Sequence, residues 1–250
     1  MAGSSPLRLL ILGGTAEASG LARLIAGEAW VASILSLAGR TRAPVLPPIP
    51  WRIGGFGGAE GLAAYIRDEG IAALIDATHP FARRISANAA LAAVACGIPR
   101  LILQRLGWRA SAGDDWREVD DIGAAARAIG TAPRRVFLTI GRQDLAPFRD
   151  LAPQHDYLIR SVDPPETGLL PPRARILTGR GPFDAAAEQR LMESNGIAVV
   201  VTKNSGGADG KLIAARNLRL PVILIARQSP PDGDRVETVE AALAWLAAQR

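Results

Sequence analysis

Three short stretches of the chain combine polar side chains with glycine in patterns that can do chemistry. The first is Gly13-Gly14-Thr15, which ends an apolar run over residues 7–12 and precedes an alanine-rich helical pattern. A buried strand that turns tightly into a helix presents backbone N–H groups where a phosphate can bind. The dinucleotide fingerprint G-x-G-x-x-G is matched only in part, because Thr15 replaces the second glycine and Ala18 the third. A plain tight turn of an α/β protein is the alternative.

The end of the next predicted strand, residues 30–37, carries Arg40, Thr41 and Arg42. Sites for NAD place an Asp or Glu here, on the ribose 2′-hydroxyl. No acidic residue occurs between Glu28 and Glu60. Guanidinium groups suit a 2′-phosphate instead, so this segment predicts NADP as the cofactor. An exposed basic loop is the alternative interpretation.

The second stretch is Asp76-Ala77-Thr78-His79-Pro80, which follows the apolar run at residues 72–75. Open α/β sheets bind ligands at this end of their strands. His79 could donate a proton or a hydrogen bond to an anionic ligand, or it could be a structural histidine near the start of a helix. Pro80 suits the first turn of that helix. Nothing in such a fold requires the charge of Asp76.

The third stretch is Lys203-Asn204-Ser205-Gly206-Gly207, with Lys211 shortly after it. A strand, a polar turn, two glycines and a helix again make a cradle for an anion. These are the only lysines of a chain with 29 basic residues. Lysine offers a compact charge and a proton donor that arginine cannot supply, although chance can also place two lysines together.

Composition excludes several classes of protein. The net charge is +5, but no run of basic residues and no interleaved aromatic residues indicate a nucleic-acid partner. Dispersed arginines fit anionic small molecules. The single cysteine, Cys96, excludes a disulfide framework and a multi-cysteine metal site. No apolar run is long enough for a membrane span and no signal peptide is recognised, so we expect a cytoplasmic protein, a monomer or weak homo-oligomer. His155 is expected to be solvated.

Apolar strand patterns alternate with helical ones along the chain, and the two halves echo each other. Residues 71–80 and 98–103 parallel residues 197–206 and 220–225, and Gly13 and Gly141 each close a first strand. The sequence therefore predicts an α/β fold of two similar Rossmann-like, doubly wound domains with a ligand cleft between them. We expect an NADP-binding domain at residues 1–112, a crossover segment at 113–130 and a substrate-side domain at 131–250. The last helix is expected from Val236.

With these motifs established, the chain resembles the precorrin-6A reductases of cobalamin biosynthesis over essentially its full length. The resemblance rests on residues 11–18 (ILGGTAEA), 37–41 (LAGRT), 76–82 (DATHPFA), 139–142 (TIGR), 179–183 (GRGPF) and 202–207 (TKNSGG). It implies two Rossmann-like domains, NADPH as cofactor, and no metal or flavin. It also implies hydride transfer to a ring double bond of precorrin-6A, a tetrapyrrole rich in carboxylates. Cobalt-free and cobalt-containing substrates both stay open.

The resemblance also suggests roles for individual residues. Residues expected to bind the cofactor are Gly13, Gly14, Thr15, Glu17, Ala18, Gly39, Arg40, Thr41 and Thr78. Residues expected to bind the substrate are Phe81, Arg142, Arg180, Gly181, Asn204, Ser205, Gly206, Gly207 and Lys211. The catalytic candidates are Asp76, His79 and Lys203, although water could also deliver the proton. A different NADP-dependent reductase of an anionic small molecule and a non-catalytic nucleotide-binding sensor are the alternative functions.

Overall fold

The structure, a computed structural model, describes residues 5–39, 41 and 46–250. Arg40 and Arg42, expected at the cofactor 2′-phosphate, lie outside the described residues. The chain forms two compact units, one made of the residues up to Leu106 together with Gln228–Arg250, the other of Gly107–Arg227. Each contains a six-stranded parallel sheet with helices on both faces. The predicted α/β class with two Rossmann-like domains is confirmed.

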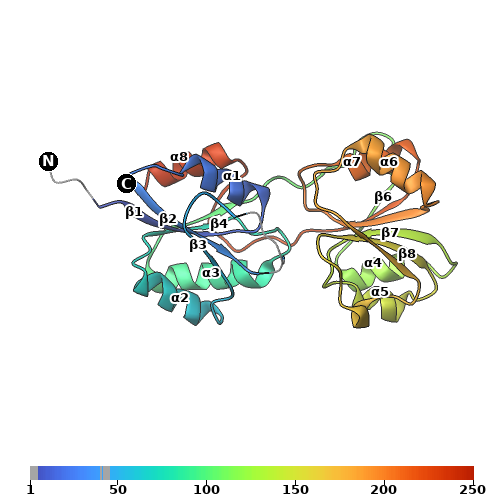
Figure 1. Ribbon diagram of the computed structural model, residues 1–250, viewed down its shortest axis with the longest axis horizontal. Coiled ribbons are helices and arrows are strands. Elements are labelled where there is room, and N and C mark those ends of the chain that lie inside the picture. The colour runs from blue at the N-terminus through green and yellow to red at the C-terminus, as the bar shows by residue number, and fades with distance from the viewer. Residues whose placement is uncertain (1–4, 40, 42–45) are drawn as a thin grey trace. The chain divides into compact units, whose positions relative to one another are not determined.

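The first unit has the strand order β12-β5-β4-β1-β2-β3, and Figure 1 shows helices on both faces of this sheet. Helices α1 and α8 lie on one face of the sheet, and α2 and α3 on the other. Its strands are β1 (Leu7–Leu12), β2 (Val31–Leu37), β3 (Trp51–Ile53), β4 (Ala73–Asp76), β5 (Arg100–Leu103) and β12 (Asp234–Val236). Its helices are α1 (Ala16–Leu24), α2 (Ala59–Asp68), α3 (Arg83–Cys96) and α8 (Val239–Ala247).

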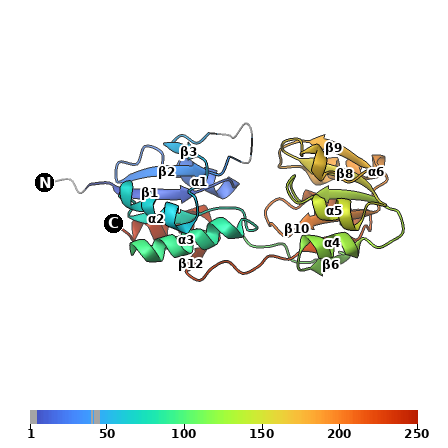
Figure 2. The ribbon, with the colours of Figure 1, turned by 90° about the horizontal axis from the view of Figure 1, so that it is seen from below.

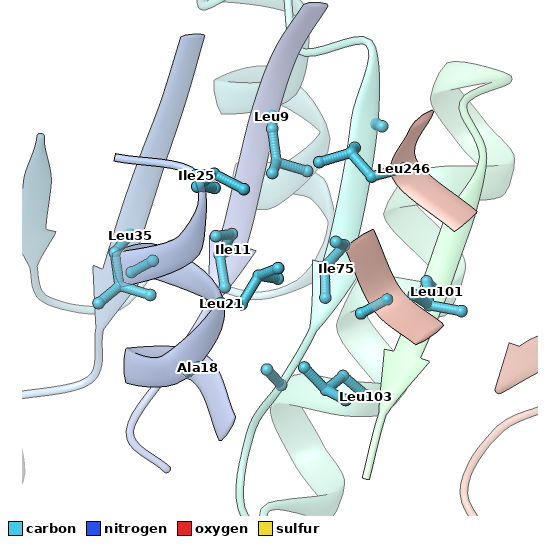
Figure 3. Close-up of a cluster of buried hydrophobic side chains, with 14 of the residues drawn as sticks. Leu9, Ile11, Ala18, Leu21, Ile25, Leu35, Ile75, Leu101, Leu103 and Leu246 are labelled. Atoms are coloured by element: carbon cyan, nitrogen blue, oxygen red, sulfur yellow. The ribbon is translucent and has the colours of Figure 1, made fainter. Parts of the chain in front are cut away.

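From Leu9 to Leu12, strand β1 is buried on both faces, as this apolar stretch predicts for the centre of a parallel sheet. Leu9 and Ile11 pack against α1 and α8, whereas Leu10 and Leu12 face α2 and α3. Figure 3 shows the first of these clusters, in which Leu246 of the C-terminal helix lies among side chains from the strands. The N-terminal and C-terminal ends of the chain therefore share one hydrophobic core.

The second unit repeats the arrangement, with the strand order β6-β11-β10-β7-β8-β9. In Figure 2 the labels β9, β8, β10 and β6 follow this order across the sheet. Its strands are β6 (Trp116–Val119), β7 (Arg135–Thr139), β8 (Asp156–Ser161), β9 (Ala174–Thr178), β10 (Val199–Lys203) and β11 (Val222–Ile225). Its helices are α4 (Ile122–Ala128), α5 (Ala146–Leu151), α6 (Ala185–Ser194) and α7 (Gly210–Asn217), with a 3-10 turn at Thr167–Leu169.

The domain boundaries differ from those expected. Residues 113–130 are not a crossover, because β6 pairs with β11 inside the second unit and Asp114 forms an ion pair with Arg216 at 2.8 Å. Residues 228–250 do not belong to the second domain, because β12 pairs with β5 and α8 packs on α1. The first sheet thus receives its sixth strand, β12, from beyond the second unit, whereas the second sheet is built from six consecutive strands, β6 to β11. Strands β6 and β12 are short and partly polar, so no periodicity identifies them in the sequence.

Two helix boundaries also differ from those expected. The last helix begins at Val239 rather than Val236, because Asp234–Val236 is a strand. Helix α3 begins at Arg83, so Pro80 lies in the turn that precedes the helix. Among the described helices, none has the length and apolar character needed to cross a membrane. Within the same residues, no three or more His, Cys, Asp or Glu side chains gather into a group that could hold a metal ion.

Candidate functional site

The strand order of each unit reverses direction at one point, between β1 and β4 in the first unit and between β7 and β10 in the second. Ligands of open α/β sheets bind outside the carboxyl ends of the strands at such a point. The three stretches that the sequence singled out all follow one of these four strands. Each unit therefore has its own candidate site, formed by the loops after β1 and β4 in the first unit and by those after β7 and β10 in the second.

The loop after β1 turns as tightly as its glycines predict. The N–H of Gly13 donates to the carbonyl of Ser36 at 2.9 Å, and a Cβ on Gly13 would lie 2.7 Å from Cδ1 of Leu35. Gly14 has a φ of +116°, which favours glycine. Ala18 is fully buried beneath Gly13, where the third glycine of the fingerprint allows close packing of helix and strand. A Cβ on Gly14 would meet no atom of the described residues within 4 Å.

Thr15 starts helix α1 and ties two loops together. Its hydroxyl accepts from the N–H of Ala18 at 3.2 Å and donates to the carbonyl of Ala77, after β4, at 2.7 Å. This is the geometry of a helix N-cap. The side chain that replaces the second fingerprint glycine therefore builds the loop and joins it to the neighbouring loop at the switch point.

Glu17, in the first turn of α1, pairs with a residue that the sequence analysis did not single out. Both of its carboxylate oxygens lie 2.9 Å from Nη1 of Arg105, just after β5. The two side chains are 18% and 24% exposed, so the pair is shielded but not fully buried. The arginine offsets the negative charge that Glu17 would otherwise present beside a bound phosphate.

The carboxyl end of β2 was expected to hold a 2′-phosphate. Gly39 has a φ of +72° and Thr41 is half-buried, while Arg40 between them is outside the described residues. Arg52 on β3 adds a guanidinium group here that the sequence analysis missed. Its Nη1 donates to Oγ of Ser36 at 2.9 Å, and its guanidinium carbon lies 4.0 Å above the ring of Phe56. The sequence gives no signal that β3 pairs with β2 in the register that brings Arg52 beside Ser36.

Asp76 ends β4 and is only 2% exposed. Its Oδ1 accepts from both the N–H and the hydroxyl of Thr78, at 3.1 and 2.7 Å, and that hydroxyl lies 3.2 Å from Oγ of Ser86. Its Oδ2 is buried and has no hydrogen-bond partner among the described residues. Oδ1 of Asp76 therefore holds the loop after β4 in place through its two hydrogen bonds with Thr78. Thr78, which was expected to bind the cofactor, donates both of these hydrogen bonds.

His79 and Phe81 form a compact turn before α3. The backbone N–H of Phe81 donates to Nδ1 of His79 at 3.2 Å, and the two rings lie 5.8 Å apart. Because Nδ1 acts as an acceptor, the neutral ring carries its proton on Nε2, as inferred from the hydrogen bonds. Both side chains are half-buried, at the edge where the glycine loop lies.

In the second unit, Lys203 at the end of β10 reaches the loop after β7. Its Nζ lies 2.5 Å from Oδ2 of Asp144, and the two side chains are 15% and 37% exposed. Gly141, with a φ of +96°, turns that loop away from the strand. The pair therefore joins the two loops at the switch point of this sheet.

Asn204, which was expected to bind the substrate, forms hydrogen bonds with the backbone of Trp108. Its side chain accepts from the N–H of Trp108 at 2.7 Å and donates to the carbonyl of Trp108 at 3.1 Å. Its own carbonyl accepts from Nε of Arg227 at 2.6 Å. The amide group thus fixes the chain segment that enters the second unit, with one bond from its oxygen and one from its nitrogen committed to Trp108.

The rest of the third stretch turns through two glycines before α7 begins. Gly206 and Gly207 have φ values of +66° and +77°, and the carbonyl of Gly207 accepts from the indole N–H of Trp108 at 2.9 Å. Nζ of Lys211, in the first turn of α7, lies 4.5 Å from the centre of the Trp108 ring. Ser205 donates its N–H to the carbonyl of Lys203 at 2.7 Å. The ring of Trp108 therefore supports both the glycine turn and the lysine.

The remaining candidates lie on loops of the same sheet edge. Arg142 is half-buried and follows β7. Arg180 and Gly181 are exposed and follow β9. All of the substrate candidates except Phe81 thus belong to the second unit, and all of the cofactor candidates belong to the first.

Comparison with known proteins fits this arrangement. The family model described as Precorrin-6x reductase CbiJ/CobK matches residues 8–247. The chain belongs to the precorrin-6x reductase family. A precorrin-6A reductase of Rhodobacter capsulatus is 51% identical over 242 residues, which is 96% of each chain. A solved structure titled CobK precorrin-6A reductase has 50% identity and a TM-score of 0.91, covering 97% of this chain and 96% of that one. A cobalt-precorrin-6A reductase of Priestia megaterium is 30% identical over 203 residues, 76% of this chain and 78% of that protein.

Family membership confirms the resemblance inferred from the six motifs, and the structure shows how these motifs lie in this reductase. Residues 11–18 and 76–82 meet through the bond from Thr15 to Ala77. Residues 139–142 and 202–207 belong to loops that Lys203 and Asp144 connect. Arg105, Arg52 and Trp108 are the partners that sequence patterns missed.

Proposed function

We propose that the chain transfers a hydride from NADPH to a ring double bond of precorrin-6A, giving precorrin-6B in cobalamin biosynthesis. The hydride adds to one carbon of the double bond, a proton adds to the neighbouring carbon, and NADP⁺ leaves. The observation that carries this proposal is the family match along nearly the whole chain. The glycine loop at the switch point of the first sheet supports it independently.

The cofactor would bind to the first unit. The turn at Gly13 and Gly14 and the first turn of α1 would hold the pyrophosphate, because backbone N–H groups and the positive end of the helix dipole meet there. The side chain of Leu35 leaves no room for a Cβ at Gly13, whereas a Cβ at Gly14 would meet no described atom within 4 Å, which fits approach of the phosphates on the side of Gly14. Asp76, Thr78 and His79 would border the nicotinamide, and Phe81 would contact the substrate. Gly39, Arg40 and Thr41 would hold the 2′-phosphate, and Arg52 on β3 would add a further guanidinium group.

The substrate carboxylates would bind to the second unit. Acetate and propionate side chains of a tetrapyrrole need several cationic groups, and arginine binds a carboxylate with two parallel hydrogen bonds. Arg142, Arg180, Lys203 and Lys211 would supply these groups. The backbone of Gly206 and Gly207 would supply N–H donors, and Ser205 would contribute its hydroxyl, because its N–H already donates to the carbonyl of Lys203. We assign Asn204 a structural role, because its side chain holds Trp108.

The proton would come from His79, from Lys203 or from water. We propose that Asp76 acts by positioning the loop that carries His79, because its Oδ1 already accepts twice from Thr78. Single-turnover reduction of bound precorrin-6A by NADPH tests the three sources. Loss of hydride transfer in His79→Ala or in Lys203→Ala alone identifies the donor, whereas retention in both assigns the proton to water.

The decisive experiment compares the affinity for NADPH with that for NADH in the wild type and in Arg40→Ala. Charge-assisted hydrogen bonds contribute about 1.5–3 kcal/mol, so the substitution should weaken NADPH binding by about 10- to 100-fold and leave NADH binding nearly unchanged. Equal affinities in the wild type would contradict the assignment of the 2′-phosphate. Binding of NADPH without oxidation in the presence of precorrin-6A would favour the nucleotide sensor.

We propose the cobalt-free tetrapyrrole as the substrate. The relatives named for precorrin-6A are more similar to this chain than the relative named for the cobalt form. Parallel assays with precorrin-6A and cobalt-precorrin-6A test the choice. A higher kcat/KM for the cobalt form would overturn it.

A further inference from the structure

A buried ion pair in the second unit lies outside the groups discussed so far. The guanidinium of Arg160 on β8 contacts both carboxylate oxygens of Glu188 on α6, with Nη2 2.8 Å from Oε2. The two side chains are 8% and 2% exposed. Burying two charges costs free energy that only good geometry repays, so such a pair is not explained by stability alone.

Two aromatic rings enclose the same guanidinium. Its central carbon lies 3.8 Å from the centre of the Phe183 ring and 5.0 Å from that of the Phe137 ring. A cation above an aromatic face is attracted by the ring quadrupole, and the attraction grows when water is excluded. Since Glu188 holds the guanidinium in one plane, Arg160 is a fixed platform for the ring of Phe183.

The ring of Phe183 in turn supports the loop after β9. A Cβ on Gly179 would lie 3.3 Å from Cζ of this ring, and a Cβ on Gly181 would lie 3.4 Å from Cδ2. The carbonyl of Phe183 packs against Gly210, where a Cβ would lie only 2.5 Å away. The ring thus lies against both of the glycines that flank Arg180, and the backbone of Phe183 packs on α7.

We propose that Glu188, Arg160 and Phe183 form a positioning device that presents Arg180 to a carboxylate of the substrate. The inference rests on the proposed function, since it assumes that Arg180 binds precorrin-6A. The order of action runs outward from the core: the ion pair fixes the guanidinium, the guanidinium fixes the ring, and the ring fixes the two glycines on either side of Arg180.

The test compares Phe183→Leu with Phe137→Leu. Each variant removes one ring from the same guanidinium, but only Phe183 contacts the loop. With one charge-assisted contact misplaced, Phe183→Leu should raise the KM for precorrin-6A about tenfold, with kcat and the KM for NADPH unchanged. Phe183→Trp, which keeps an aromatic face, should restore the KM. Phe137→Leu should lower Tm without changing either KM. Equal KM values in Phe183→Leu and Phe137→Leu would overturn the proposal.

A double variant separates this proposal from the proposed function. If Phe183 acts through Arg180, the KM of Arg180→Gln/Phe183→Leu should equal that of Arg180→Gln alone. Additive effects would refute the coupling. Amide hydrogen exchange gives a readout without substrate: residues 179–183 should exchange faster in Phe183→Leu but not in Phe137→Leu. If Phe183→Leu exchanges faster but Arg180→Gln leaves the KM for precorrin-6A unchanged, Phe183 anchors the loop and Arg180 has no role in binding the substrate.

Discussion

The ammonium group of Lys203 lies 2.5 Å from Oδ2 of Asp144 and so joins the loops that follow β10 and β7. In the first unit, Thr15 makes the equivalent connection, with its hydroxyl 2.7 Å from the carbonyl of Ala77. Each link spans the point where the strand order of its sheet reverses. The link in the second unit is ionic, whereas the link in the first unit is neutral. This difference fits a carboxylate-rich ligand on one unit and a nucleotide on the other.

Replacing Asp144 by Asn removes the internal competitor for Lys203. We expect the KM for precorrin-6A to fall several-fold, because the ammonium group then pairs with a substrate carboxylate instead. The pair is partly exposed, so the free energy of unfolding should fall by no more than about 1 kcal/mol. Steady-state kinetics and denaturant titration measure the two effects. Asp150→Asn, which alters an exposed pair with Arg149, is the control, and an unchanged KM in Asp144→Asn would argue that Lys203 has only a structural role.

Thr15→Val should remove both the cap of α1 and the link to Ala77. Loss of an N-cap costs about 0.5–2 kcal/mol of unfolding free energy, and the misplaced loop should also weaken NADPH binding. Thr238 provides a matched control, because it caps α8 through the N–H of Ala241 at 3.2 Å and lies at no loop of the site. Thr238→Val should lower stability alone. If the two variants bind NADPH equally well, Thr15 has no role beyond capping.

Leu246→Ala tests whether the C-terminal helix belongs to the cofactor-binding unit. This side chain is fully buried in the core that also contains Leu9 and Ile75 (Figure 3). Truncating a buried leucine costs about 2–5 kcal/mol, so denaturant unfolding should show a large loss, and NADPH should restore part of it by binding the folded state. Leu91→Ala, at a position 63% exposed, should change stability by less than about 0.5 kcal/mol. Similar losses in both variants would contradict the assignment.

His155 should make stability depend on pH, contrary to the expectation that it is solvated. It is 0% exposed, with Nδ1 accepting from the N–H of Arg134 at 3.2 Å and Nε2 3.0 Å from the carbonyl of Gly130. Burial lowers the pKa of His155 in the folded protein below its ordinary value. At a pH between the folded and the unfolded pKa, the unfolded chain therefore binds more protons than the folded protein.

The stability contributed by neutral His155 is therefore complete above the unfolded pKa of about 6.5 and is lost as the pH falls below it. We expect the free energy of unfolding to decrease between about pH 6.5 and pH 5. Denaturant titrations across this range measure the slope, and His155→Gln should reduce it. An identical slope in that variant would assign the dependence to other groups.

Sequence patterns identified the elements whose signals are local. Strand β1 begins and ends where the apolar run predicts, and β4, β7 and β10 lie within about two residues of their predicted ends. Glycine and threonine at residues 13–15 predict a tight turn into a helix because φ preferences and capping act between near neighbours. The echo between the two halves is confirmed in the same way, since each half repeats the local signals of one Rossmann-like sheet.

The partners of the polar side chains could not be predicted in this way. Glu17 and Arg105 are 88 residues apart, and Asn204 and Trp108 are 96 residues apart. Which atoms meet across such separations depends on the packing of whole layers, and the residue types alone allow many pairings. For this reason a residue expected to touch the substrate, Asn204, has a structural role.

By itself, the sequence determined the α/β class, the positions of the central strands, the loops that can bind anions and the family. Only the tertiary structure decided which unit each end of the chain completes. Strands β6 and β12 contain three or four residues with few apolar positions, so their pairing with β11 and β5 carries no periodic signal. Their place is set by the unpaired edge of a sheet already formed, whose backbone N–H and C=O groups accept a sixth strand.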